Sequence, residues 1–407
     1  MNDQPLLSVD EALAAVLAAV RPLAPVSVPL PEARGRYLAR QVNAELDLPP
    51  FANSAMDGYA LRSADTPGRL RVVGESAAGR PFDRSLGAGE AIAISTGAAI
   101  PDGADTVVMI ERATVLGAGA AIEVGTSSPV HDNVRNAGSD VKRGQTVLDG
   151  GALIGPPQIG AAASLGLAEL PVRERPRVAV LPTGDELRRP GEPLAYGQIY
   201  NSNGPMLRAL FEEAGAVVID EIPAIADTPE AHRDALRTAL EFDLVVSSGG
   251  VSVGPHDLVR AAGRELGVRE LFWRIAMKPG KPLSFGVRER TDGAGPCLVF
   301  GIPGNPVSTL VCFELFVKPA LRALAGAAYP EPSFGSGVLA RAVDRNPERE
   351  EFVRVHANAL SELDPLQGQQ SHQISTSAGA SGLARIARGD GRLEAGTMVP
   401  YLPLGTG

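Results

Sequence analysis

The sequence has few aromatic residues, two cysteines and no long apolar run. Aromatic residues make up 4% of the 407 residues, so the hydrophobic cores must be built mainly from Val, Leu, Ile and Ala. Cys297 and Cys312 form no CxxC pair, and no histidine lies near either in the sequence. This spacing argues against a zinc site and favours reduced, buried thiols. Because no run of about 18 apolar residues is present, we expect no membrane-spanning helix.

The chain also lacks clustered basic residues and a secretion signal. Its formal net charge is −9, and no stretch concentrates Lys and Arg as in proteins that bind nucleic acid phosphates. The first residues, MNDQPLLSVDEAL, have neither a basic start nor an apolar centre. We therefore expect a cytoplasmic protein that binds neither nucleic acid nor membrane. An acidic surface with a few placed Lys and Arg suits a small anionic substrate.

Length and local patterns predict several domains. A chain of this length is expected to form about two to four of them. Ser8 and Glu11 have the spacing of a capping box in front of an amphipathic helix. We predict a discontinuous N-terminal helical or linker domain from residues 1–45 and 146–175. It is interrupted by a small β domain at residues 46–145, where short β-rich runs alternate with Gly, Pro and Asp turns.

The second half of the chain has a different rhythm. Between residues 176 and 327 apolar strands alternate with helices, a spacing typical of βαβ units and a mostly parallel sheet. Residues 328–407 return to β-rich runs and predict a C-terminal β domain. The expected fold is therefore multidomain α/β plus β, with a central α/β domain flanked by small β domains and an N-terminal helical segment. Ligands of such sheets bind beyond the carboxyl ends of the strands.

Three loops rich in small and polar residues follow predicted strands of the α/β domain. They are residues 183–186 (TGDE), 247–252 (SSGGVS) and 302–308 (IPGNPVS). Glycine lets the backbone approach a ligand closely and can present N–H groups to an anion. A tight turn that needs glycine is the alternative explanation for each loop taken alone. Three such loops at the strand ends of one sheet predict binding of a phosphate-bearing ligand.

Two lysines three residues apart form a further candidate anion site. Lys278 and Lys281 flank a Pro-Gly turn, which can aim both ammonium groups at one anion. Solvated loop lysines are the alternative, and composition alone favours that reading.

Carboxylates also gather near the strand ends, at Asp185, Glu186, Asp227 and Asp257. Hard oxygen ligands close to phosphates suit Mg²⁺. Asp227 and Asp257 fit helix caps equally well, whereas Asp185 and Glu186 do not.

Six segments, taken in order, resemble one family. They are PPFANSAMDGYAL, STGAAIPDGADTVVMIE, RVAVLPTGDEL, VVSSGGVSVG, IAMKPGKP and GIPGNPVS. Together they resemble the MoeA-type molybdopterin molybdenumtransferases, a group that includes the C-terminal half of gephyrin, and the resemblance covers residues 8–399. The SSGGVS segment is shared with molybdopterin adenylyltransferases, whereas MDGYA and KPGKP favour the transferase.

The resemblance implies a reaction and an assembly. Members insert molybdenum from molybdate into adenylylated molybdopterin, release AMP, and use Mg²⁺. They form elongated homodimers in which the cleft lies between the α/β domain of one subunit and the small β domain of the other. A molybdopterin adenylyltransferase is a further expected partner. From its own sequence context Asp57 would be read as a turn residue, and only the resemblance gives it a function.

The resemblance also assigns residues to roles. The expected catalytic residues are Asp57, Glu186, Lys278 and Lys281, and the expected metal ligands are Asp185, Glu186 and Asp257. The expected substrate-binding residues are Thr96, Arg135, Asp140, Thr183, Gly184, Ser247, Ser248, Gly249, Gly250, Ser252, Arg274, Pro303, Gly304, Asn305 and Pro306. Two positions depart from the family pattern, because Arg274 stands where many relatives have Lys and Asn201 where Asp is common. Gln369, Ser371 and Ser375 match a polar family loop only loosely.

Two alternative functions remain at this point. A molybdopterin adenylyltransferase would use ATP and need the α/β domain alone, so the additional β domains and MDGYA argue against it. A non-catalytic molybdopterin-binding scaffold would not need the intact set of lysines and carboxylates.

Overall fold

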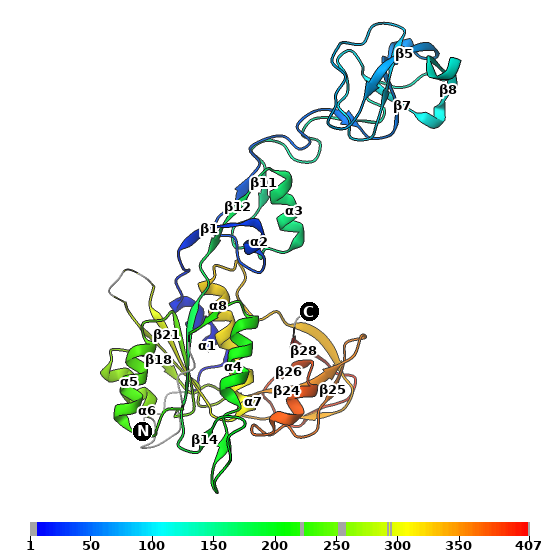
Figure 1. The fold of residues 1–407 in the computed structure, drawn as a ribbon. Coiled ribbons are helices and arrows are strands. Elements are labelled where there is room, and N and C mark those ends of the chain that lie inside the picture. The colour runs from blue at the N-terminus through cyan, green and yellow to red at the C-terminus, as the bar shows by residue number, and fades with distance from the viewer. Residues whose placement is uncertain (1–5, 220–223, 251–257, 291–292, 294, 406–407) are drawn as a thin grey trace.

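The computed structural model describes residues 6–219, 224–250, 258–290, 293 and 295–405. The molecule is elongated (Figure 1): a small β domain lies at one end, a slender middle region follows, and an α/β body with an attached β barrel forms the other end.

The α/β body is built on a six-stranded mixed sheet. Its strand order is β16 (Val217–Val218), β13 (Arg177–Pro182), β17 (Leu244–Ser248), β21 (Cys297–Ile302), β20 (Ser284–Arg288) and β18 (Arg269–Trp273). The first four strands are parallel, and β20 runs antiparallel to both of its neighbours. The mostly parallel sheet predicted from the alternation of strands and helices is thus confirmed.

Helices cover both faces of this sheet. Alternate residues of a strand face opposite ways, and in β13 Val180 joins the core beneath α4, whereas Leu181 joins the core beneath α5 and α6. The helices of the body are α4 (Asn203–Glu213), α5 (Pro229–Ala239), α6 (Leu258–Glu265), α7 (Pro306–Cys312), the π-helical η4 (Phe313–Val317) and α8 (Lys318–Leu324). Thr228, not Asp227, caps α5, because its side chain accepts a hydrogen bond from Ala231 N at 3.3 Å.

The first helix, α1 (Val9–Ala19), starts at the predicted capping box. Ser8 N donates to Glu11 Oε2 at 2.8 Å, and Glu11 N donates to Ser8 Oγ at 3.2 Å. Its buried residues, Val9 among them, pack into the core of the α/β body. We expected this helix in the N-terminal domain of residues 1–45 and 146–175. It lies instead with the α/β body, because that core offers the apolar surface that its buried face covers.

The middle region is made from two distant parts of the chain. It contains β1 (Pro25–Pro29), α2 (Leu30–Ala33), β2 (Val42–Asn43), β11 (Thr146–Leu148), α3 (Pro156–Ser164) and β12 (Glu169–Arg173). β1 pairs with β12 and β2 pairs with β11, both antiparallel. Leu38 and Leu170 share one small core. The chain therefore enters and leaves the small β domain through this region.

The small β domain is a six-stranded sheet with a side pair. The sheet order is β7 (Thr106–Met109), β4 (Gly58–Leu61), β6 (Glu90–Ile94), β5 (Gly68–Ser76), β9 (Ala121–Val124) and β8 (Ala113–Leu116). The side pair is β3 (Asn53–Ser54) with β10 (Val134–Arg135). Three 3₁₀ turns complete it: η1 (Ser63–Asp65), η2 (Ile110–Arg112) and η3 (Gly117–Gly119).

The C-terminal domain is a small closed barrel. β24 (Glu350–Ala357), β25 (Glu362–Pro365), β22 (Gly335–Leu339), β28 (Met398–Pro403) and β26 (Gly382–Ile386) pair in this order, and β26 returns to pair with β24. A second pair joins β23 (Val343–Asp344) to β27 (Arg392–Leu393), and η5 (Ile374–Gly379) follows β25. The short β19 (Met277–Lys278) of the α/β body pairs with the start of β24. This pairing and shared core residues such as Phe352 fix the barrel to the body.

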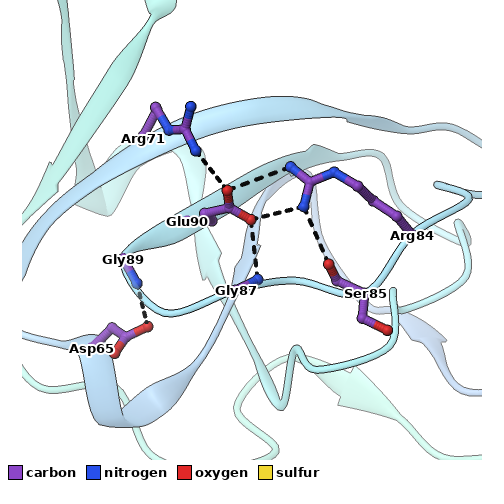
Figure 2. A network of polar contacts seen from close by, with 7 residues as sticks. All are labelled: Asp65, Arg71, Arg84, Ser85, Gly87, Gly89 and Glu90. Carbon is purple, nitrogen blue, oxygen red and sulfur yellow. Dashed lines mark hydrogen bonds and ion pairs between the residues drawn. The ribbon is translucent and has the colours of Figure 1, made fainter.

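A carboxylate fixes the loop between β5 and β6 (Figure 2). Glu90 accepts hydrogen bonds from Arg71 Nη2 at 2.7 Å, from Arg84 Nη1 at 3.0 Å and from Gly87 N at 3.0 Å. The hydrogen bond from Arg84 and that from Gly87 lower the pKa of Glu90 from its usual value to about 2. The loop that precedes β6 is therefore held by charge as well as by its backbone.

This network predicts an acid-sensitive contribution to stability. A carboxyl group whose pKa is lowered by folding stabilises the protein above its unfolded pKa, and the contribution is lost as pH falls through the folded pKa. We predict that Glu90→Gln is less stable than the wild type at neutral pH and that the difference disappears between about pH 4 and about pH 2. Urea unfolding across this range measures it. Glu75→Gln, on the exposed side of β5, is the matched control. A difference that stays constant with pH would contradict the prediction.

Candidate functional site

The carboxyl ends of three parallel strands meet at one edge of the sheet. Pro182 at the end of β13 pairs with Ser248 of β17, which pairs with Ile302 of β21. Residues 183–186 follow Pro182 directly, whereas the predicted loops 247–252 and 302–308 begin inside β17 and β21. Of the second loop, residues 247–250 are described. A cavity of about 880 Å³ lies beyond the strand ends. Its lining includes Thr183, Gly184, Glu186, Leu187, Ile199, Tyr200, Asn201, Ser202, Asn203, Asp227, Ser248, Gly249, Gly250, Arg274, Lys281, Pro282, Pro303, Gly304, Asn305, Pro306, His372 and Ile374.

Glycine allows two of these loops to pack against each other. Gly249 has a φ of +102°, and a Cβ at this position would lie 2.6 Å from Thr183 Oγ1. A Cβ at Gly304 would lie 3.6 Å from the Cα of Gly249. A side chain at Gly249 would therefore force the loops apart.

The expectation that these loops present backbone N–H groups to an anion is wrong for three residues. Thr183 N donates to Ser248 O, Gly184 N to Ile225 O, and Gly249 N to Ile302 O. These donors are used by the protein itself, because they continue the pairing of the strands. These three N–H groups are therefore not available to an anion in the cavity.

Two cationic side chains line the cavity, Arg274 and Lys281. Neither has a carboxylate within ion-pair distance in the described part of the chain. Lys278 behaves differently, because its Nζ lies 3.0 Å from Glu351 Oε1 on β24 and it is absent from the lining. The structure thus brings Lys281 to the cavity and ties Lys278 to the barrel.

The acidic residues are divided between the lining and a supporting position. Glu186 and Asp227 line the cavity, whereas Asp185 Oδ1 accepts a hydrogen bond from Asp227 N at 3.1 Å. Asp257, expected as a metal ligand, and Ser252, expected to bind substrate, lie outside the described residues. Within the residues that the structure describes, no group of three or more His, Cys, Asp or Glu side chains could hold a metal ion.

Two predictions on buried residues have different outcomes. Ser247 is 1% exposed, and its hydroxyl donates to Phe300 O at 3.5 Å, so it lies inside the sheet and does not line the cavity. Cys297 and Cys312 are free and buried, as predicted. Burial raises the pKa of the Cys297 thiol to about 12, which makes it unreactive at neutral pH.

Asn203 is a site residue that the sequence did not reveal. It opens α4 and is 9% exposed. Its Nδ2 donates to Ser248 Oγ and to Gly304 O, both at 2.7 Å, and so joins two of the three loops. Its Oδ1 is buried and has no hydrogen-bond partner among the described residues. The run NSN at residues 201–203 was the only signal, and a helix start explained it equally well.

The C-terminal barrel contributes one wall of the cavity through residues 366–379. His372 and Ile374 line it, and Ser371 Oγ accepts a hydrogen bond from Asn305 Nδ2 at 2.9 Å. The loop is held from below by Arg354, which is fully buried and donates to Gln373 O at 2.7 Å. The loop that matched the family only loosely in sequence therefore reaches the site, through Ser371 and the unpredicted His372.

The predicted residues of the small β domain lie apart from this cavity. Asp57 Oδ1 accepts hydrogen bonds from Thr96 N at 2.7 Å and from Thr96 Oγ1 at 3.1 Å, and both residues are exposed. Arg135 of β10 pairs with Asn53 of β3, and both Arg135 and Asp140 are exposed. Figure 1 shows this domain at the far end of the molecule. Within one chain, therefore, these residues do not reach the α/β cavity.

Comparisons with known proteins cover almost the whole chain. Family models match in order: the MoeA N-terminal region (domain I and II) at residues 7–166, a probable molybdopterin binding domain at 179–323, and the MoeA C-terminal region (domain IV) at 326–404. Molybdopterin molybdenumtransferase 2 of Mycobacterium tuberculosis is 37% identical over 410 residues, covering 96% of this chain and 98% of the relative. The chain belongs to the MoeA family.

Further MoeA relatives agree. The molybdopterin molybdenumtransferase of Haemophilus influenzae is 36% identical over 381 residues, covering 92% of each chain. The crystal structure of the MoeA protein from Pyrococcus horikoshii superposes with a TM-score of 0.83 at 29% identity, covering 98% of this chain and 100% of that chain. In the described residues of this MoeA-family chain, no helix is long and apolar enough to cross a membrane.

The position of Asn203 predicts a measurable loss of stability. Asn203→Ala removes two hydrogen bonds, one buried and one partly buried, and takes the donor away from Gly304 O. We expect it to lower the free energy of unfolding by about 1–3 kcal/mol. Asn201→Ala is the matched control, because Asn201 Oδ1 accepts one hydrogen bond, from Gly204 N. Denaturant unfolding measures the free energy of unfolding of both variants. Equal decreases in the two variants would show that Asn203 does not join the loops.

Proposed function

We propose that this protein is a molybdopterin molybdenumtransferase, which inserts molybdenum from molybdate into adenylylated molybdopterin and releases AMP in molybdenum cofactor biosynthesis. The observation that carries the proposal is the cavity at the strand ends, lined by two cationic side chains without carboxylate partners among the described residues. The substrate contains a pyrophosphate linkage and the second reagent is an oxyanion, so both suit such a cavity. The names of the relatives support the same reaction.

Arg274 and Lys281 bind the anionic parts of the substrates. Cleavage of the pyrophosphate linkage leaves negative charge on the departing AMP. Cationic donors that are already in place stabilise such charge without reorganising. The guanidinium of Arg274 can hold two phosphate oxygens at once, whereas Lys281 supplies a compact charge that suits molybdate or one phosphate.

The loops hold the organic part of the substrate. Gly249, Gly250 and the turn of residues 303–305 line the cavity and would contact a flat pterin or nucleotide there.

Mg²⁺ fits the acidic side of the cavity. Glu186 and Asp227 would hold it, directly or through water, with Asp185 and Asp257 as further candidates. Mg²⁺ commonly uses one or two carboxylates and keeps several waters. A bound Mg²⁺ would supply additional positive charge for the phosphates of the linkage, beside that of Lys281 and Arg274.

We further infer a homodimer that completes the site. Asp57 is exposed, is oriented by two hydrogen bonds from Thr96, and lies far from the cavity of its own chain. In the dimer, Asp57, Thr96, Arg135 and Asp140 of one subunit face the cavity of the other. Asp57 then acts as a base or orients the attacking group. We place the reaction in the cytoplasm, which the free thiols fit, with a molybdopterin adenylyltransferase as the partner that supplies the substrate.

AMP release tests the proposed function. With Mg²⁺ present, we expect release of AMP from adenylylated molybdopterin that depends on added molybdate. Folded protein that binds the substrate but releases no AMP would favour the non-catalytic scaffold. ATP-dependent adenylylation of free molybdopterin would favour the adenylyltransferase.

Asp57→Asn is predicted to abolish turnover and to leave fold and dimerisation intact. The amide keeps the size of the side chain but cannot take up a proton or carry charge. Turnover, circular dichroism and light scattering measure the three properties. Wild-type turnover in this variant would remove Asp57 from the catalytic residues.

The two lysines are predicted to differ. Lys281→Ala should weaken molybdate or AMP binding by about tenfold to a hundredfold, because a charge-assisted contact is lost. Lys278→Ala should lower the melting temperature and leave the binding affinity nearly unchanged, because Glu351, which is 16% exposed, loses its partner. Calorimetric titration and thermal unfolding compare them. The reverse order of effects would show that Lys278 is the anion-binding residue.

A further inference from the structure

One tryptophan lies between two arginines next to the cavity. Trp273 ends β18 and is the one tryptophan of the sequence. The guanidinium carbons of Arg260 and of Arg274 each lie 3.9 Å from the centroid of its ring. Of these two arginines, Arg274 lines the cavity. The ring therefore contacts a side chain that lines the cavity.

The two arginines differ in whether a carboxylate neutralises their charge. Arg260 on α6 is paired with Glu270 of β18 through two contacts, Nε to Oε2 at 2.5 Å and Nη2 to Oε1 at 2.8 Å. Arg274 has no such carboxylate among the described residues. Pairing of Arg260 with Glu270 allows two cations to share one ring, because it offsets their mutual repulsion. It leaves the charge of Arg274 available to the cavity.

The backbone and the ring together define where Arg274 can go. Arg274 has a φ of +69°, which is uncommon for a residue other than glycine, and its N donates to Leu283 O at 2.9 Å. The indole Nε1 of Trp273 is buried without a hydrogen-bond partner in the described part of the chain. The ring is thus held by what packs on its faces, and not by its polar atom.

We propose that Trp273 is a positioning residue for oxyanion binding: clamped by Arg260 and Glu270, its ring holds the guanidinium of Arg274 where it meets a phosphate or molybdate oxygen. The inference rests on the proposed function, and assigns within that cavity the group that fixes the anion. Trp273 acts through Arg274 and does not touch the anion itself. An aromatic face attracts a guanidinium and also limits the rotamers that the free side chain would sample.

A double-mutant cycle on the full-length protein tests this inference, with inorganic pyrophosphate as the probe and calorimetry as the measurement. We expect Trp273→Leu to weaken pyrophosphate binding by about tenfold. Trp273→Phe, which keeps a flat ring, should bind within about threefold of the wild type. In an Arg274→Ala background, Trp273→Leu should change the affinity by less than about twofold, because the residue it positions is gone.

The lone tryptophan gives a second, independent signal. Its emission should change saturably as pyrophosphate is added to the wild type, and this change should be lost in Arg274→Ala. The proposal is overturned if Trp273→Leu binds like the wild type, if it weakens binding equally in both backgrounds, or if the wild type binds no pyrophosphate. A purely structural role would appear as that equal loss together with a lower melting temperature. Neither the binding measurement nor the fluorescence measurement depends on AMP release. Both can therefore be interpreted even if the protein does not catalyse the proposed reaction.

Discussion

The parallel pairing of β13, β17 and β21 brings Pro182, Ser248 and Ile302 side by side. Because each strand ends at the same edge, the loops that follow have to share one space, and Gly249 lets them do so without a clash with Thr183. The same pairing uses up backbone N–H groups at that edge. The sheet therefore creates the cavity but supplies little of its positive charge.

The charge is brought by other parts of the molecule. Arg274 and Lys281 come from the connection between β18 and β20, beside the parallel strands. This connection is anchored on one side by the stack on Trp273 and on the other by the pairing of β19 with β24. The barrel also supplies His372, on a loop held by the buried Arg354. The C-terminal domain thus supports the cavity as well as closing one wall of it.

The sequence predicted those features that depend on local pattern. The capping box at Ser8, the alternation of strands and helices, and the position of the three small-residue segments at the strand ends are all of this kind. The structure confirms them for the residues that it describes, which include 247–250 of the second segment. The domain limits inferred from composition remain a proposal. Features set by partners distant in sequence were missed. Asn203 bonds to residues 45 and 101 positions away, and nothing in its neighbourhood encodes either contact.

Other differences have the same origin. The core that α1 joins is built by residues more than a hundred positions later in the chain. The apolar face of α1 therefore predicted that the helix is buried, but not which domain it packs against. Lys278 and Lys281 look equivalent in sequence, and the barrel strand that carries Glu351 separates their roles. Asp57 is the extreme case, because it lies in the small β domain, apart from the α/β cavity of its own chain, and its proposed role needs a second copy.

Mixed subunits test the central claim, that each cavity is completed by the small β domain of the other subunit. Asp57→Asn chains, predicted to lack turnover, and Lys281→Ala chains, predicted to bind the substrates weakly, are co-expressed with different tags. AMP release is measured at substrate concentrations too low to occupy Lys281→Ala sites. If the two chains pair at random, about half of the dimers contain one chain of each kind. Each of these mixed dimers has one site in which both Asp57 and Lys281 are intact. The account predicts that about a quarter of wild-type AMP release returns, and that it is found in dimers that carry both tags. Activity in the mixed dimers no higher than in either parent would show that Asp57 and Lys281 do not meet across subunits.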